Sequence, residues 1–165
     1  MRKWIVFILI MGSFTFAEAK ECVFCNQRIM ETQSVYEGDH FKVLVDHEPR
    51  VRGHLLVVSK RHVSKAHELS SKEWEELSQI VPKVVSVFSE FLHTDQYVVL
   101  EKNGPNAFQQ VPHVHFHFFP VTTQTWADIF NVAPRRLEPY ELEEEAALFR
   151  FRFSSIPKDP CPECK

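Results

Sequence analysis

The chain has 165 residues, enough for one domain with its own hydrophobic core and too few for two domains of usual size. Hydrophobic residues make up 44% and charged residues 25%, which is ordinary for a globular protein. The formal net charge is -3, so the sequence lacks the basic character expected of a protein that binds a nucleic-acid polymer.

The first 19 residues have the pattern of a secretory signal peptide. A basic start is followed by an apolar run over residues 4–11 and by the small-x-small sequence Ala17-Glu18-Ala19. The apolar run is short for a membrane span, and an uncleaved anchor is the alternative. We therefore expect an exported protein, periplasmic or secreted and cleaved after Ala19, with membrane contact only through residues 1–19 if they are retained.

Four cysteines form two C-x-x-C pairs, one near each end of the chain that would remain after cleavage. The first pair, Cys22 and Cys25, has the spacing of a zinc knuckle. Disulfides are an alternative in an oxidising compartment. A four-cysteine site that includes Cys161 and Cys164 is another, although zinc-ribbon pairs are usually only about 15–20 residues apart.

Strands are predicted at four places before the most informative stretch of the chain. The β-forming runs at 34–37 and 41–46 flank the turn-forming pair Gly38-Asp39, which predicts a hairpin. Apolar runs at 54–59 and 97–101 predict two further strands. The short turns between neighbouring strands favour an antiparallel sheet.

Helices are predicted at two places. Ser-x-x-Glu at 70–73 is a capping box, and apolar residues at three-and-four spacing over residues 74–92 form one face of a long helix. Pro82 should kink or split that helix. Residues 139–149 predict a second helix, although the alternation of Phe and Arg over 149–153 fits a strand equally well. Antiparallel strands with one long helix imply an α+β fold.

The most informative stretch is residues 111–120, in which three histidines alternate with apolar residues. Such period-two alternation is typical of a half-buried strand. The three imidazoles would share one face of the strand and the apolar side chains the other: His113, His115 and His117 against Val114, Phe116 and Phe118. Two functions fit a row of imidazoles, metal chelation by His-x-His or a nucleophilic imidazole with flanking helpers.

With Gln109 four residues before His113, this stretch resembles the signature of the histidine triad (HIT) superfamily of nucleotide hydrolases and transferases. The resemblance covers most of the chain from Cys22 onward. It implies a HIT-like fold, a mainly antiparallel five-stranded meander sheet with one long helix packed on it, and usually a homodimer. We expect a HIT domain core at 20–125 and, at 126–165, a C-terminal extension with the second helix and the second C-x-x-C.

The resemblance also implies roles for individual residues. The middle histidine, His115, would be the nucleophile, and His117 would contact the phosphate or the leaving group. Asp46, which ends a predicted strand, would hold the ribose hydroxyls, while Asn103 and Gln109 would bind phosphate. From the residues alone, Asp46 and Asn103 fit turn chemistry as well, and a second Gln beside Gln109 offers another register.

A branch of the family holds zinc with this C-x-x-C, a histidine after the Lys-rich strand end and the first histidine of the triad. The matching residues are Cys22, Cys25, His62 and His113. Two thiolates and two imidazoles make a closed tetrahedral site, which is structural rather than catalytic. Zinc bound there would fix His113 and the start of the catalytic strand.

Three residues depart from the family pattern. Phe108 stands where many members have Gly, Gln110 where many have Ser or Thr, and Val121 where bacterial relatives have Arg. A Gly at the first of these positions would let backbone N–H groups approach a phosphate. Phe108 would either narrow that approach or stack on a substrate base.

The resemblance thus implies a nucleotide-binding hydrolase that cleaves a phosphoanhydride or phosphoramidate bond at the α-phosphate of a nucleotide. Its substrates would be dinucleoside polyphosphates or nucleoside phosphoramidates, and a covalent nucleotidyl-histidine would be the intermediate. Two alternatives stay open: a nucleotidyltransferase of the same superfamily, and a zinc- or nucleotide-binding module without turnover. A label left by substrate on His115 would distinguish turnover from binding alone.

Overall fold

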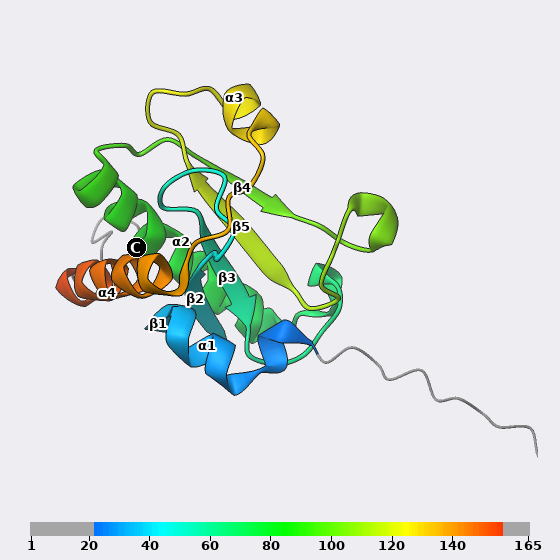
Figure 1. Cartoon of the computed structure of the whole chain (residues 1–165). Coiled ribbons are helices and arrows are strands. Elements are labelled where there is room, and N and C mark those ends of the chain that lie inside the picture. The colour runs from blue at the N-terminus through cyan, green and yellow to red at the C-terminus, as the bar shows by residue number, and fades with distance from the viewer. Residues whose placement is uncertain (1–21, 157–165) are drawn as a thin grey trace, which may run out of the picture.

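The computed structural model describes residues 22–156 (Figure 1). The predicted signal peptide at 1–19 and the second cysteine pair, Cys161 and Cys164, lie outside the described residues. Between 22 and 156 the chain forms one five-stranded sheet with four α-helices and three short 3-10 helices. None of the described helices is both long and apolar enough to cross a membrane.

The sheet is antiparallel throughout and its strands follow the order β1-β2-β3-β5-β4. It is therefore a meander only over its first three strands, because β5 inserts between β3 and β4. This arrangement confirms the predicted α+β fold with a five-stranded antiparallel sheet. The strands are β1 (Ser34–Glu37), β2 (Phe41–Val45), β3 (Leu55–Ser59), β4 (Tyr97–Glu101) and β5 (His115–Pro120).

The long helix α2 (Ser71–Leu92) begins as the capping box predicts. The Ser70 side chain accepts from the backbone N–H of Glu73, and the Glu73 carboxylate accepts from the N–H of Ser70. The predicted split at Pro82 is wrong, because the helix runs through it without a break. Buried apolar side chains on both sides of the proline hold the two halves against the sheet and offset the one backbone hydrogen bond that proline cannot donate.

The C-terminal helix α4 (Pro139–Ser155) includes residues 149–153, for which the sequence allowed either a helix or a strand. Phe149 and Phe153, four residues apart, are buried, while Phe151 is 63% exposed, which is helical spacing rather than strand alternation. Two short helices have no signal in the sequence analysis, α1 (Gln27–Gln33), capped by the side chain of Asn26, and α3 (Trp126–Asn131).

The two faces of the sheet carry different layers. Helices α2 and α4 contribute to the main hydrophobic core with Phe116 and Phe118 of β5, whereas Leu56 and Val58 of β3 form a smaller cluster with Met30 of α1. Figure 1 shows α1 in front of the sheet and α2 behind it. His115 and His117 stand opposite Val58 and Leu56 in the β3–β5 register, and both line a cavity on the α1 side. The long helix thus supports β5 from the face opposite the cavity.

Candidate active site and metal centre

The predicted triad strand is shorter than expected. β5 begins at His115, so His113 lies before the ladder instead of on the same strand face as the other two histidines. The reason is that the backbone N–H of Val114 donates to the carbonyl of Val63 (2.8 Å), outside the sheet, and Pro112 has no N–H to donate. The first histidine is therefore free to serve another site, while the second and third remain together.

His115 is buried, and its ring is held in one tautomer. Its Nδ1 lies 2.6 Å from the backbone carbonyl oxygen of His113, which can only accept, so Nδ1 carries the proton and Nε2 keeps its lone pair. Burial, with a smaller effect of the Lys102 charge, lowers the pKa of His115 below its ordinary value. The imidazole is thus neutral and nucleophilic at neutral pH. The ring of Phe24 packs against it with 4.9 Å between centroids.

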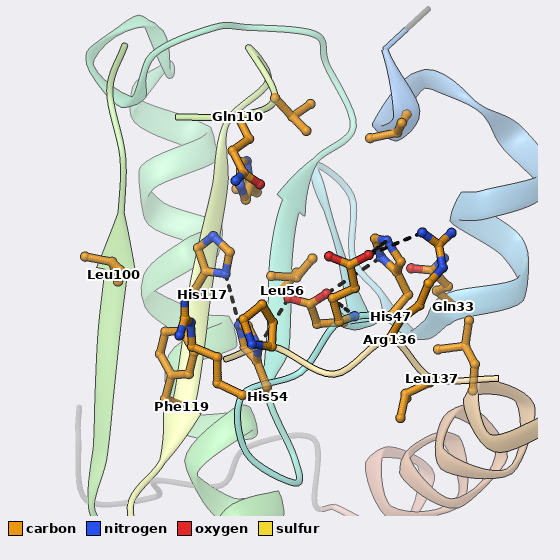
Figure 2. Close-up of a pocket in the computed structure, with 18 of the residues that line it drawn as sticks. Gln33, His47, His54, Leu56, Leu100, Gln110, His117, Phe119, Arg136 and Leu137 are labelled. Atoms are coloured by element: carbon orange, nitrogen blue, oxygen red, sulfur yellow. Dashed lines mark hydrogen bonds and ion pairs between the residues drawn. The ribbon is translucent and has the colours of Figure 1, made fainter. Parts of the chain in front are cut away.

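Polar contacts link His117 to the Asp46 carboxylate through His54, a histidine outside the triad. His117 Nδ1 is 3.0 Å from His54 Nε2, and His54 Nδ1 is 3.2 Å from Asp46 Oδ2, although that last pair is not aligned for a linear hydrogen bond. Figure 2 shows the His54–His117 contact across neighbouring strands. His54 is 3% exposed. Sequence analysis missed it because a single histidine at the head of an apolar strand has no periodicity to reveal it.

Burial determines the protonation of these three side chains. It lowers the pKa of His54 well below its usual value, and it lowers the pKa of His117 to about 3, with help from the neighbouring His115 and Lys102. Both rings are therefore uncharged in the free protein at neutral pH. Burial also raises the pKa of the Asp46 carboxyl. Of the two contacts, the one between His54 and His117 has hydrogen-bond geometry, whereas Asp46 lies beside His54 as a neighbouring carboxyl.

A cavity of about 720 Å³ opens over these histidines (Figure 2). Its wall is mixed: aromatic and aliphatic side chains occur with cations that would suit a phosphate and with the carboxylates of Asp46, Glu48 and Glu138, of which Glu48 pairs with Arg136 at 3.3 Å. The apolar part includes Phe24, Ile29, Leu56 and Leu100, and the cations are Arg50, Lys102 and Arg136.

The segment after β5 completes the cavity. Trp126 and Phe130 line it, and the Trp126 ring packs on Phe119 with 5.2 Å between centroids. Arg50 donates to the backbone carbonyls of Phe130 (3.0 Å) and Val132 and so fixes this segment. Residues beyond β5 thus build part of the cavity wall.

Asp46 is the one predicted substrate-binding residue that lines the cavity together with His115 and His117. It is 7% exposed, and its Oδ1 accepts from the backbone N–H of Glu48 at 2.9 Å. The turn chemistry that the sequence allowed is therefore present. Its other oxygen faces His54, so Asp46 is placed to act on His54 as well as on a ligand.

Asn103 and Gln109 are engaged elsewhere. The side-chain oxygen of Asn103, Oδ1, accepts a hydrogen bond from the backbone N–H of Ala66 at 2.8 Å. The Gln109 side chain accepts from the N–H of Gly104 (2.7 Å) and donates to the carbonyl of Ser64 (2.7 Å). Neither side chain lines the cavity, so the structure does not bring them together with His115. These contacts tie the loop before β5 to the loop after β3.

Gln110 lines the cavity instead. Figure 2 shows it at the end of the cavity away from Leu137. The two adjacent glutamines thus have different positions: Gln109 forms hydrogen bonds within the loop, and Gln110 lines the cavity. Sequence spacing alone could not assign these roles, because the two glutamines are adjacent and differ by only one residue in their separation from the histidines.

Four side chains predicted to bind metal converge beside the cavity. The Cys22 thiol lies 3.3 Å from His113 Nδ1, and the Cys25 thiol lies 3.0 Å from His62 Nδ1 and 3.7 Å from His113 Nδ1. Ligands at about 2.3 Å (S) and 2.0 Å (N) around a tetrahedral zinc are about 3.5 Å apart, so these separations fit. His113 Nε2 is 2.6 Å from the carbonyl of Ser59, which leaves Nδ1 unprotonated to ligate. Both thiols are free.

Local structure explains this convergence. The knuckle is a 3-10 turn, in which the N–H of Cys25 donates to the carbonyl of Cys22 at 2.9 Å. His62 follows Arg61, whose guanidinium forms two hydrogen bonds with the Glu73 carboxylate at 3.0 and 2.7 Å. The start of α2 therefore anchors the segment that carries His62. This donor set could hold one tetrahedral cation of the zinc type.

Comparison with known proteins identifies relatives. A model of the HIT domain family matches residues 27–124. The adenosine 5'-monophosphoramidase of Schizosaccharomyces pombe is 40% identical over 76 residues, which are 46% of this chain and 54% of the relative. The bis(5'-adenosyl)-triphosphatase of Dictyostelium discoideum is 32% identical over 104 residues, 61% of this chain and 70% of the relative. Both relatives are named as hydrolases.

Solved structures share the fold. A hypothetical histidine triad nucleotide-binding protein from Sulfolobus tokodaii has a TM-score of 0.68 and 27% identity, covering 81% of this chain and 92% of that chain. A Zn-bound histidine triad family protein from Mycobacterium smegmatis has a TM-score of 0.63 and 26% identity, covering 81% of this chain and 93% of that chain.

Proposed function

Because the chain belongs to the HIT domain family, we propose that it is a nucleotide hydrolase that releases a nucleoside monophosphate by way of a covalent intermediate on His115. The observation that carries the proposal is the state of this side chain. It is a buried imidazole in the wall of the cavity, and its Nδ1 is committed to a backbone carbonyl. The names of the two relatives support substrates in which the α-phosphate of adenosine is joined to an amine or to a further phosphate.

In the first step, the Nε2 lone pair of His115 attacks the α-phosphorus. An N–P bond forms, and the bond from phosphorus to the departing nitrogen or oxygen breaks. The leaving group takes that electron pair and a proton. The ring becomes cationic, and its charge is stabilised because Nδ1–H donates to the carbonyl of His113.

In the second step, the oxygen of a water molecule attacks the same phosphorus. The N–P bond breaks, its electron pair returns to Nε2, and the water gives up a proton. The net reaction adds one water across the scissile bond and regenerates neutral His115. Its low pKa suits this role, because a neutral imidazole is ready for the next attack.

His117 would move the protons in both steps. A bound phosphate would raise its pKa, since a nearby negative charge favours the protonated ring. His54 Nε2 contacts His117 Nδ1, so the outer nitrogen of His117, Nε2, is left to exchange a proton with the leaving group and with the attacking water. Asp46 would also hold the ribose, as the resemblance implies. Arg50 and Lys102 line the cavity and would neutralise phosphate charge.

We also propose that the donor set of Cys22, Cys25, His62 and His113 holds one structural zinc. The metal would join the mature N-terminus, the segment after β3 and the start of β5, with no part in the chemical steps. Export directed by residues 1–19 and a homodimeric state are further proposals, which rest on the sequence and on the resemblance.

The proposed function is tested by turnover. The chain purified without residues 1–19 is incubated with adenosine 5'-phosphoramidate and with diadenosine triphosphate, and the AMP released is quantified by chromatography. We expect AMP from at least one substrate and a rate lower by a factor on the order of thousands in His115→Asn. His67→Asn changes an exposed histidine outside the cavity and is the control. A near wild-type rate in a folded His115→Asn variant would refute the assignment.

A further inference from the structure

Phe108 has an unusual conformation for a large side chain. Its φ is +60°, and of the described non-glycine residues only His93 shares a positive φ. L-residues with bulky side chains rarely adopt this region, because Cβ crowds the neighbouring carbonyl. Its side chain is also 79% exposed, the highest value among the large exposed hydrophobic residues of the described chain. A strained and exposed aromatic residue points to a function that folding alone does not explain.

The surrounding loop enforces this conformation. The N–H of Phe108 donates to the carbonyl of Pro105 (3.0 Å), and the N–H of Gln109 donates to the carbonyl of Gly104 (3.1 Å). The Gln109 side chain closes the loop from the other side by accepting from the Gly104 N–H and donating to Ser64. Phe108 is therefore held in place by its neighbours, with its own ring outside the network.

The ring lies at the cavity that contains the nucleophile. Phe108, Gln110 and His115 all line it. Figure 2 places Gln110, two residues after Phe108, at the end opposite Leu137, and Gln33 and His47 lie toward the Leu137 side. Asp46, the proposed ribose partner, immediately precedes His47. The loop that carries Phe108 and Gln110 thus reaches the cavity at the end opposite Leu137, whereas His47, the residue after Asp46, lies toward Leu137. In the described chain, no aromatic or cationic side chain stacks on the Phe108 ring.

We propose that Phe108 is a specificity-determining residue that stacks on a planar, aromatic leaving group beyond the α-phosphate. This inference rests on the proposed function, since it names the part of the substrate that leaves. A rigid loop presents the ring without further ordering, so little conformational entropy is lost on binding. Stacking on an aromatic plane needs no hydrogen-bond pattern, so an indole amine and a purine base would both be accepted.

The test compares two substrates with the same scissile P–N bond. One is adenosine 5'-phosphoramidate, whose leaving group is ammonia, and the other is the tryptamine amide of AMP. Phe108→Asn removes the ring and keeps a residue that tolerates positive φ, while Phe108→Trp keeps an aromatic plane. Phe151→Ala removes another largely exposed ring, 63% exposed against 79% for Phe108, from α4 outside the cavity and is the matched control.

We expect Phe108→Asn to lower kcat/KM for the tryptamine amide about 5- to 100-fold, mainly through KM, and to change that of the ammonia compound less than twofold. Phe108→Trp should restore the aromatic substrate, and Phe151→Ala should change neither. The melting temperature of Phe108→Asn should not fall, because the strained ring contributes no packing. Equal losses on both substrates, no loss on either, or a shift in oligomeric state on replacing Phe108 would overturn the proposal.

Binding separates this proposal from the proposed function. The dissociation constants of the same two compounds are measured calorimetrically on His115→Asn, alone and combined with Phe108→Asn. A selective loss for the tryptamine amide supports the stacking role even if the wild-type protein hydrolyses neither compound, an outcome that would refute only the hydrolase. Equal binding with and without the ring would refute the stacking role even if both compounds are hydrolysed.

Discussion

At the scale of single residues, one carbonyl decides which nitrogen of His115 can react. The backbone oxygen of His113 accepts a hydrogen bond from Nδ1–H of His115, and the His113 side chain faces the cysteines. His113 thus contributes to two sites: its backbone carbonyl orients the proposed nucleophile, and its imidazole belongs to the proposed metal donor set. The division is possible because β5 begins only after His113.

His117 can be tested by varying the leaving group. We expect His117→Ala to slow a phosphoramidate with a poor leaving group about 10²–10⁴-fold, because general acid help is lost. An AMP ester with a nitrophenolate leaving group needs no proton and should lose much less. Steady-state rates on both substrates give the comparison. Equal losses would mean that His117 is not the acid.

His54 is expected to act through His117. In His54→Ala, His117 Nδ1 loses its partner at 3.0 Å and the buried Asp46 loses its neighbour. We expect kcat to fall about 10–100-fold on the poor leaving group with little change in KM, and stability to fall by about 1–3 kcal/mol. Urea unfolding and kinetics measure the two effects separately. Full activity on the poor substrate would exclude an action of His54 through His117.

At the scale of elements, the start of α2 stabilises the segment that carries His62. Glu73 is 3% exposed and accepts two hydrogen bonds from Arg61. The hydrogen-bonded Arg61 guanidinium has the largest effect, and together with the helix cap it lowers the pKa of Glu73 from 4.5 to about 2. The folded state therefore prefers the ionised carboxylate, which is worth about 3 kcal/mol of stability.

This shift has a defined pH dependence. Because the folded pKa is depressed, the stabilisation is present above about pH 4.5 and is lost as the pH falls toward 2. Glu73→Gln should therefore be less stable than wild type by about 2–3 kcal/mol at pH 7, and the difference should shrink at pH 3. Glu75→Gln, an exposed carboxylate in the same turn, is the control. A difference that does not depend on pH would contradict the ion-pair account.

The sequence predicted elements best where the local signal and the packing agree. The capping box at Ser70 and the apolar face after it identified α2, and the Gly38-Asp39 turn identified the β1–β2 hairpin. The predicted break at Pro82 was wrong because the burial of apolar side chains on both sides of the proline outweighs one missing backbone hydrogen bond. α1 was missed because its seven residues carry only a single capping signal, at Asn26.

The candidate site was predictable only in part, for a similar reason. Spacing identified the three histidines, and the family resemblance supplied the set of four metal donors that the structure brings together. Spacing could not give His54, which reaches His117 only through the β3–β5 pairing between residues 63 apart. Nor could it show that Gln109 turns into its own loop, since that depends on the carbonyl of Ser64.

At the scale of the whole molecule, the metal cluster joins segments far apart in sequence. We predict about one zinc per chain. Cys22→Ser or His62→Ala should release it and lower the melting temperature, because structural zinc contributes binding free energy on the order of 10 kcal/mol to folding. Activity should fall with it, since the start of β5 loses its anchor.

Metal analysis and differential scanning calorimetry on the same samples check this prediction. Cys161→Ser and Cys164→Ser are the controls and should keep the zinc. Absence of zinc from the wild-type protein, or its loss only on changing the C-terminal pair, would contradict the assignment to Cys22, Cys25, His62 and His113.

The central claim is that the α-phosphate of a nucleotide passes through a covalent bond to His115, and trapping that bond tests it most directly. The protein is mixed with excess adenosine phosphoramidate, quenched within milliseconds at alkaline pH, and analysed by intact mass and peptide mapping. The account predicts one adenylyl group per chain on His115, formed and lost at rates fast enough for turnover, and none in His115→Asn. Turnover without an adduct, or an adduct on another residue, would contradict it.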